Sequence, residues 1–327
     1  MNSIICEIDG EIAKVNKRIN KIVVGRNSTM NEVMEYILQT KGKQLRPRMA
    51  IAASRLTGKF PDITEKCAAL ELCHTASLIH DDIIDDAKER RGQPSVQHKY
   101  GKAIAVYAGD YIIFSLIKNA KISRKEPYMY VLKELDRLCD GELDQYCNRF
   151  NYDITIEDYL NIIYEKTCYL FELACKIGAD AAKMNEQQKE KLKTFAEYFG
   201  YSFQLRDDIL DFQLYDDNKL LNKTINYDFW NGYFTLPIIF ALQDKSTKDF
   251  IKNIIEKNKS EINREDFISL SKELNSIGAY AYTIGRIEEY ASKAITALND
   301  FDDSDYKRYL IEMLNKNIKT VTQIKFV

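Results

Sequence analysis

Proline and glycine are scarce in this sequence, whose 327 residues include five prolines and thirteen glycines. Both residue types end or bend helices, so their scarcity predicts long helices joined by short connections. The alternation of apolar and polar residues that is typical of strands is also nearly absent. A helical period of apolar residues runs through 128–150, 156–177 and 187–214, and we expect loops over 90–95, 123–127, 151–155 and 216–232. The sequence therefore predicts an all-α fold.

No repeat, low-complexity tract or proline-rich linker divides the chain. With 45% apolar residues, it can bury one large core. We therefore expect a single domain over residues 1–327.

Long apolar runs are missing, and we expect no secretory leader. The most apolar stretch, 234–242, is too short to span a bilayer and contains Pro237. The first ten residues carry Glu7 and Asp9 instead of a basic start followed by an apolar run. The seven cysteines form no Cys-x-x-Cys pair, which is typical of reduced thiols. We expect a soluble, cytoplasmic protein that could still touch a membrane transiently.

A strong excess of one charge is missing as well. The formal net charge is -2, which argues against general affinity for nucleic acid.

Two acidic clusters share one spacing. The first, Asp81-Asp82-Ile83-Ile84-Asp85, and the second, Asp207-Asp208-Ile209-Leu210-Asp211, each follow an apolar, helix-prone run. Residues four apart lie on one helix face, so the outer carboxylates of each cluster would repel one another. Divalent cations such as Mg²⁺ would remove this repulsion and bind phosphate oxygens at the same time. A solvated helix face is the alternative for either cluster alone, but the repetition favours metal.

Basic residues flank the acidic ones. Lys43, Arg46 and Arg48 open an apolar helix whose first turn would hold Pro47, and a helix amino end attracts anions. Arg90 and Arg91 follow the first acidic cluster, and guanidinium groups suit bidentate phosphate contacts. Together with the acidic clusters they predict a metal–diphosphate site.

An ordered series of motifs resembles the trans-isoprenyl diphosphate synthases of the medium- and long-chain (polyprenyl) type. The resemblance covers about residues 41–242. It rests on these residues: Gly42-Lys43-x-x-Arg46-Pro47, His74, Asp81-Asp82-x-x-Asp85, Arg90-Arg91-Gly92, Gly109-Asp110, Gly141-Glu142, Lys166-Thr167, Phe203-Gln204, Asp207-Asp208-x-x-Asp211 and Thr235-Leu236-Pro237.

The resemblance implies an all-α bundle around a deep central cavity, as in isoprenoid synthases, and a homodimer. It implies that isopentenyl diphosphate is joined to an allylic diphosphate with Mg²⁺ as cofactor. Magnesium would be held by Asp81, Asp85, Asp207 and Asp211, with Asp82 and Asp208 as further catalytic carboxylates. The allylic diphosphate would be bound by Arg90, Lys166, Thr167, Gln204 and Lys223, and isopentenyl diphosphate by Lys43, Arg46, His74 and Arg91.

The sequence departs from the family pattern at three places. Lys41 stands where the family has a glycine, and Asn222 replaces another glycine, before Lys223. Tyr233 stands where the family has a lysine, two residues before Thr-Leu-Pro. The last change removes one expected diphosphate contact.

Small residues precede the first acidic motif. Cys73, Ala76 and Ser77 lie one helical turn and more before Asp81, where a bulky side chain would stop the growing chain early. We therefore expect a medium- or long-chain product, although close helix packing would also explain these residues.

The sequence leaves other functions open. A short-chain farnesyl or geranylgeranyl diphosphate synthase would share the same motifs. A terpene cyclase would not need the second set of basic residues. A non-catalytic subunit of a heteromeric synthase is compatible with Tyr233. A helical scaffold, whose acidic clusters are only surface residues, would show no Mg²⁺-dependent ligand binding.

Overall fold

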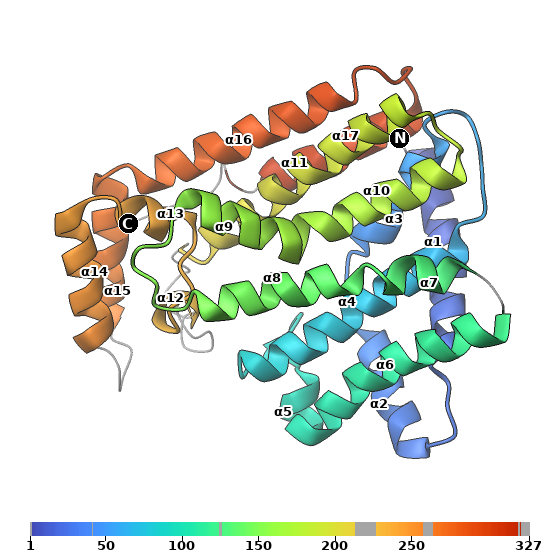
Figure 1. The fold of residues 1–327 in the computed structure, drawn as a ribbon, viewed down its shortest axis with the longest axis horizontal. Helices are drawn as coiled ribbons and strands as arrows, with labels where there is room; N and C mark the ends of the chain where they lie inside the picture. The colour runs from blue at the N-terminus through green and yellow to red at the C-terminus, as the bar shows by residue number, and fades with distance from the viewer. Residues whose placement is uncertain are drawn as a thin grey trace. The chain divides into compact units, whose positions relative to one another are not determined.

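The computed structural model describes residues 2–40, 42–123, 126–212, 227–257, 264–319 and 321. Every regular element of its described part is a helix apart from one hairpin of two-residue strands, so the all-α prediction is confirmed (Figure 1). The chain forms two compact units, one of residues 1–136, 172–192 and 301–310, the other of residues 137–171, 193–300 and 311–327.

The first unit is arranged around one buried helix, α4 (Thr64–Ile84), which packs against α6 along much of its length (Figure 1). Its neighbours also include α1, α3, α5 and α7. The apolar stripe of α1 recurs every three or four residues, the period of a helix with one face in the core. The elements that begin in this unit are α1 (Asn2–Val23), α2 (Ser28–Gln39), α3 (Leu45–Arg55), β1 (Glu89–Arg90), β2 (Gln93–Pro94), α5 (Val96–Tyr100), α6 (Lys102–Ser123) and α7 (Glu126–Leu132).

The second unit has its own apolar core. The short helix α13 (Leu236–Ala241) contributes the buried Ile238 and Ile239, and it contacts α9, α15 and α16. The elements that lie in this unit, beside α13, are α9 (Ile156–Ile163), the π-helix η1 (Tyr164–Cys168), α12 (Tyr227–Trp230), α14 (Lys245–Lys257), α15 (Arg264–Ser276) and α16 (Ala279–Ala297). Among the described elements, four helices have residues in both units: α8 (Leu135–Cys147), α10 (Tyr169–Ala181), α11 (Glu186–Leu210) and α17 (Asp305–Lys319).

The helix predicted over 128–150 is interrupted. Helix α7 ends at Leu132 and α8 begins at Leu135. Between them the amide of Glu134 bonds the carbonyl of Val131 in a tightened turn, and the Glu134 side chain pairs with Lys176 at 3.2 Å. The apolar period continues through the break, which is why it could not indicate this turn.

The other expected elements need smaller corrections. Residues 156–177 are helical as predicted, but a π-helical segment replaces α-helix over Tyr164–Cys168. Helix α11 ends at Leu210, short of the predicted 214. The segment 90–95, predicted as a loop, contains part of the hairpin. Most of the loop predicted at 216–232 lies outside the described residues.

Candidate active site

The first acidic motif occupies the carboxyl end of α4. The amide of Asp85 donates to the carbonyl of Asp81 at 2.8 Å, so these two residues are one helical turn apart on one face. The middle residue, Asp82, is turned away from this face and buried, with 3% of its surface exposed. Its carboxylate accepts a hydrogen bond from Arg90 Nε at 2.8 Å. The motif thus separates two half-buried carboxylates, Asp81 and Asp85, from a buried one that binds an arginine.

The β1–β2 hairpin places the two arginines that follow the motif. Arg91 and Gly92 both have positive φ, 55° and 75°, the conformation that a tight two-residue hairpin turn requires. Arg90 therefore returns to α4, while Arg91 donates through NH1 to the carbonyl of Thr40 at 3.0 Å. A Cβ at Gly42 would lie 2.4 Å from the Arg91 guanidinium carbon, so any larger residue there would displace this guanidinium. The hairpin is therefore in direct contact with the basic segment, residues 42–48.

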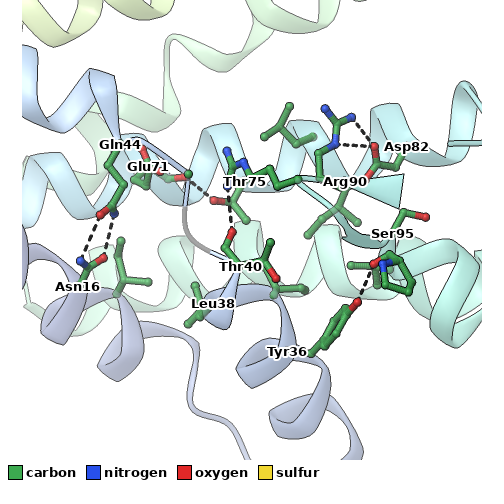
Figure 2. A pocket seen from close by; sticks show the side chains of 18 of the residues that line it. Asn16, Tyr36, Leu38, Thr40, Gln44, Glu71, Thr75, Asp82, Arg90 and Ser95 are labelled. Carbon is green, nitrogen blue, oxygen red and sulfur yellow. Dashed lines mark hydrogen bonds and ion pairs between the residues drawn. The ribbon is translucent and has the colours of Figure 1, made fainter. Parts of the chain in front are cut away.

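The basic segment contains a strained residue that the amino-terminal helix supports. Gln44, between Lys43 and Arg46, has φ 50° and ψ 45°, a left-handed conformation that is unfavourable for a residue with a side chain. The side-chain amides of Gln44 and of Asn16, a residue of α1, exchange two hydrogen bonds, at 2.9 and 3.2 Å (Figure 2). No sequence pattern indicated Asn16, because this contact joins residues 28 positions apart.

His74 and Arg46 are joined within the first unit. Arg46 NH1 lies 2.9 Å from His74 Nε2. Burial, together with the positive charges of Arg46, Arg91 and Arg90, lowers the pKa of His74 well below its usual value. The imidazole is therefore neutral at neutral pH, and its Nε2 accepts the hydrogen bond that a guanidinium can only donate.

A cavity of about 80 Å³ adjoins these residues in the first unit (Figure 2). Apolar side chains such as Ile19 and Leu78 line it together with Arg91 and the carboxyl-bearing Glu71. Glu71 is 8% exposed, and desolvation raises its pKa despite the nearby charges of Arg46 and Arg91. Sequence patterns did not single out Glu71.

The second acidic motif occupies the carboxyl end of α11, and its middle carboxylate is again the most buried of the three. Asp207 is half-buried and Asp211 is exposed, whereas the middle residue, Asp208, is 6% exposed. The Asp208 carboxylate accepts hydrogen bonds from the buried Tyr159 hydroxyl and from Gln204 Nε2, the latter at 2.8 Å. Burial nevertheless raises the pKa of Asp208 to about 7.

The π-helix carries Lys166 and Thr167 in the second unit. A π-helical turn is wider than an α-turn and is often found at functional sites. Thr167 Oγ1 donates to Gln204 Oε1 at 2.7 Å, which extends the hydrogen-bonded chain from Asp208. Lys166 Nζ contacts Glu142 Oε2 at 2.8 Å and Gln145 Oε1 at 2.6 Å, both on α8. Four of the residues chosen from the sequence are thus placed by one short segment and its neighbours: Lys166, Thr167, Gln204 and Asp208.

Two glycines allow other helices to approach the π-helix closely. A Cβ at Gly141 of α8 would lie 2.7 Å from the Lys166 nitrogen, and one at Gly200 of α11 would lie 2.6 Å from the Cys168 Cα. In each case the clash would involve backbone, which cannot simply move aside. The position of the π-helix therefore depends on glycine on two neighbouring helices.

The donor set of the two motifs fits Mg²⁺. Both motifs lie at helix carboxyl ends, where the helix dipole disfavours carboxylates and favours cations. Mg²⁺ commonly binds one or two carboxylates and takes its other oxygens from substrate phosphates and water. Across the described residues, no three His, Cys, Asp or Glu side chains converge as a ready-made metal site.

The remaining candidate residues are placed as follows. Lys43 is exposed, Cys73 and Ala76 are buried at 1% and 2% exposure, and Ser77 is half-buried with its hydroxyl on the His74 carbonyl. Lys223 lies outside the described residues. The first motif belongs to one unit and the second motif to the other. None of the described helices is long and apolar enough to cross a membrane.

Known proteins resemble this chain over most of its length. Component 2 of the heptaprenyl diphosphate synthase of Geobacillus stearothermophilus is 34% identical over 244 residues, 74% of this chain and 75% of that protein. The crystal structure of a decaprenyl diphosphate synthase from Rhodobacter capsulatus matches with a TM-score of 0.88 and 25% identity, covering 98% of this chain and 99% of that one.

A polyprenyl synthase from Caulobacter crescentus, solved with calcium and isoprenyl diphosphate, matches with a TM-score of 0.85 and 27% identity, over 97% of each chain. The model of one protein family, polyprenyl synthetase, matches residues 27–269. That match and the similarity to the heptaprenyl enzyme show that this chain, as its motifs predicted, belongs to the polyprenyl synthetase family.

Proposed function

We propose that this protein is a prenyltransferase that condenses isopentenyl diphosphate with an allylic diphosphate to make a medium- or long-chain all-trans polyprenyl diphosphate. One observation carries the proposal. Each acidic motif ends a helix with two outer carboxylates that are half-buried or exposed, while its middle carboxylate is buried and bonds a polar side chain. Each arrangement suits a group of metal ligands that serves a substrate diphosphate.

Magnesium is the metal we assign to these motifs. Asp81 and Asp85 would hold it on the first motif, and Asp207 and Asp211 on the second. When bound, Mg²⁺ neutralises the negative charge that develops on the departing diphosphate. The complex of calcium with the Caulobacter enzyme supports a divalent cation in this family.

Two sets of residues would bind the two diphosphates. Arg90, Lys166, Thr167 and Gln204 would hold the allylic substrate, with Lys223 as a further ligand outside the described residues. Lys43, Arg46, His74 and Arg91 would hold isopentenyl diphosphate. In this scheme Asp82 and Asp208 act through their partners, Arg90 and Gln204, and not through direct metal contact.

The reaction proceeds by ionisation and addition. The allylic carbon–oxygen bond breaks, and the electron pair leaves with the diphosphate. The double bond of isopentenyl diphosphate then attacks the allylic cation, and a proton passes to the released diphosphate as the new double bond forms. Binding both substrates close together supplies much of the rate, and the exclusion of water protects the cation.

Product length and assembly follow from the same proposal. The names of the heptaprenyl and decaprenyl relatives support a product longer than farnesyl or geranylgeranyl. We assign Cys73, Ala76 and Ser77 to the wall that leaves room for it. We also propose a homodimer in the cytoplasm, although the word component in the name of the Geobacillus relative favours a two-protein synthase as the alternative.

The test is elongation by the purified chain. We expect products from isopentenyl diphosphate and farnesyl diphosphate with Mg²⁺, none after the metal is removed with a chelator, and a chain-length ladder that ends above twenty carbons. Asp81→Ala and Asp207→Ala each remove a metal ligand and should lower kcat by about 100-fold or more. A matched control, Asp249→Ala, removes an exposed carboxylate of α14 outside every motif and should retain activity.

Two results would contradict parts of this proposal. No product with farnesyl, geranyl or dimethylallyl diphosphate would reject a stand-alone synthase and favour a partner subunit. A ladder that ends at fifteen or twenty carbons would reject the long-chain product while keeping the reaction.

A further inference from the structure

Tyr233 occupies the position where the resemblance leads one to expect a lysine. It follows Gly232, whose φ of 82° requires glycine, and its amide donates to the carbonyl of Asp228 at 2.8 Å. Tyr233 is therefore tied through its backbone to the segment that carries Asp228.

An arginine from a distant segment lies against this tyrosine. The guanidinium carbon of Arg149 is 5.1 Å from the centre of the Tyr233 ring, 5.3 Å from that of Tyr146 and 5.7 Å from that of Phe150. Arg149 Nε also donates to the carbonyl of Asn231 at 2.7 Å. Cation–π contacts with three rings and one hydrogen bond thus hold a positive charge beside position 233.

The backbone of the two segments is joined at the same place. The amide of Phe150 donates to the carbonyl of Gly232 at 2.9 Å. A Cβ at Gly232 would lie 2.6 Å from the Phe150 ring, so glycine is needed for this approach. The position of Arg149 relative to Tyr233 is therefore fixed by packing and not by the two side chains alone.

The terminal nitrogens of Arg149 keep their hydrogen-bonding capacity. Within the described part of the chain, Nε is the one Arg149 nitrogen with a hydrogen-bond acceptor. NH1 and NH2 carry four further N–H groups in the planar arrangement that matches two phosphate oxygens. Arg149 is half-buried, so part of its side chain is exposed to solvent.

Arg149 also lies along the same stripe as the residues that contact Lys166. Glu142, Gln145 and Arg149 are three and four residues apart, the spacing of one helix face. Although α8 ends at Cys147, the Arg149 amide still bonds the Tyr146 carbonyl at 3.3 Å, so the turn continues. Because Glu142 and Gln145 both contact Lys166 Nζ, the stripe leads from Lys166 to Arg149.

We propose that Arg149 is a diphosphate-binding residue that supplies the positive charge absent at position 233. The inference rests on the proposed function, since the ligand is the diphosphate of the allylic substrate. An arginine just after α8 and a lysine at position 233 would each place one positive charge in this part of the second unit. Tyr233 then serves as the ring against which the guanidinium is stacked.

The test combines removal and rescue. Arg149→Gln removes the charge but keeps a polar side chain, and we expect KM for farnesyl diphosphate to rise about 10- to 100-fold, the usual range for lost charge-assisted hydrogen bonds. KM for isopentenyl diphosphate should stay within about twofold, since a different set of residues binds it. Adding Tyr233→Lys to Arg149→Gln should recover most of the loss, which a merely structural role of Arg149 would not allow.

Arg286→Gln is the matched control. Arg286 is also stacked on a tyrosine of the second unit, at 4.6 Å from the Tyr290 ring, but belongs to no proposed site. It should leave both KM values unchanged. An Arg149→Gln enzyme with an unaltered KM for farnesyl diphosphate, or a loss that Tyr233→Lys does not repair, would overturn the inference.

A binding measurement separates this inference from the proposed function. Calorimetry with inorganic diphosphate and Mg²⁺ needs no turnover, so it applies even to a chain that makes no product. Weaker binding by Arg149→Gln than by the wild type, with recovery in the double variant, supports Arg149 in either case. Equal binding by all three proteins rejects it.

Discussion

Identical carboxylates within each acidic motif are in different environments. Successive helix residues point about 100° apart, so the middle aspartate cannot share the face of the outer two. Asp82 is buried against Arg90, and Asp208 against Tyr159 and Gln204. Spacing alone predicted which pairs lie together, but the partner of each middle residue comes from packing that the spacing does not describe.

Glu71 leads to a prediction on stability. Desolvation raises its pKa, so the folded protein binds this proton more tightly than the unfolded chain does. The ionised carboxylate therefore costs stability above the unfolded pKa of about 4.3, and the cost grows until the pH passes the folded pKa. Glu71→Gln should raise Tm at pH 8, with a gain on the order of 1 kcal/mol, and the gain should disappear toward pH 4.5.

Thermal unfolding of both proteins between pH 4.5 and 8 provides this measurement. Gln93→Glu is a suitable reference for a change of one charge at an exposed position of the same unit. The Tm difference between Glu71→Gln and the wild type should vary with pH. A constant difference would show that the Glu71 carboxyl has the same pKa in the folded and unfolded protein.

At the scale of elements, the π-helix determines where Lys166 and Thr167 lie. The sequence predicted a helix here, since the apolar period of 156–177 is continuous. It could not indicate the wider turn, because a π-helix depends on what packs against it. Here the neighbours are Gly141 on α8 and Gly200 on α11.

Adding a methyl group at either glycine should therefore damage the site. Gly141→Ala and Gly200→Ala would each press on π-helix backbone, and we expect a loss of about 1–3 kcal/mol in unfolding free energy together with a raised KM for the allylic substrate. Gly285→Ala is the control, because Gly285 lies in α16 and an added methyl group would meet no other described part of the chain within 4 Å, beyond the neighbouring residues and backbone of its own helix. It should stabilise the protein by about 0.5–1 kcal/mol. Neutral effects at both Gly141 and Gly200 would contradict the role of glycine in positioning the π-helix.

At the scale of the whole molecule, α6 carries an apolar surface in the first unit. Its exposed side chains include Val106, Tyr107, Phe114 and Ile117, with Tyr107 64% exposed. Large apolar side chains gathered on one surface are typical of an interface with another protein. This surface supports the proposed dimer, while the single domain over residues 1–327 stays a prediction that cooperative unfolding would test.

Tyr107→Glu should therefore disrupt the dimer. A charge at a central aromatic position of an interface commonly costs about 2 kcal/mol or more, which raises the dissociation constant about 30-fold. Sedimentation velocity should show a wild-type dimer and a variant that dissociates at micromolar concentration. Val24→Glu, at a residue that is 68% exposed outside α6, should remain dimeric. A monomeric wild-type protein would exclude the homodimer and leave the two-protein synthase.

The sequence by itself determined the helical fold, the positions of both acidic motifs and the family of the chain. These properties depend on local spacing, since helix geometry alone places residues four apart on one face. Tertiary structure decided what packing between distant residues controls. Asn16 and Gln44 are 28 positions apart, and Arg149 and Asn231 are 82 apart. The support of the basic segment and the cation beside Tyr233 exist only in the folded chain, because no short-range pattern records which distant side chains meet.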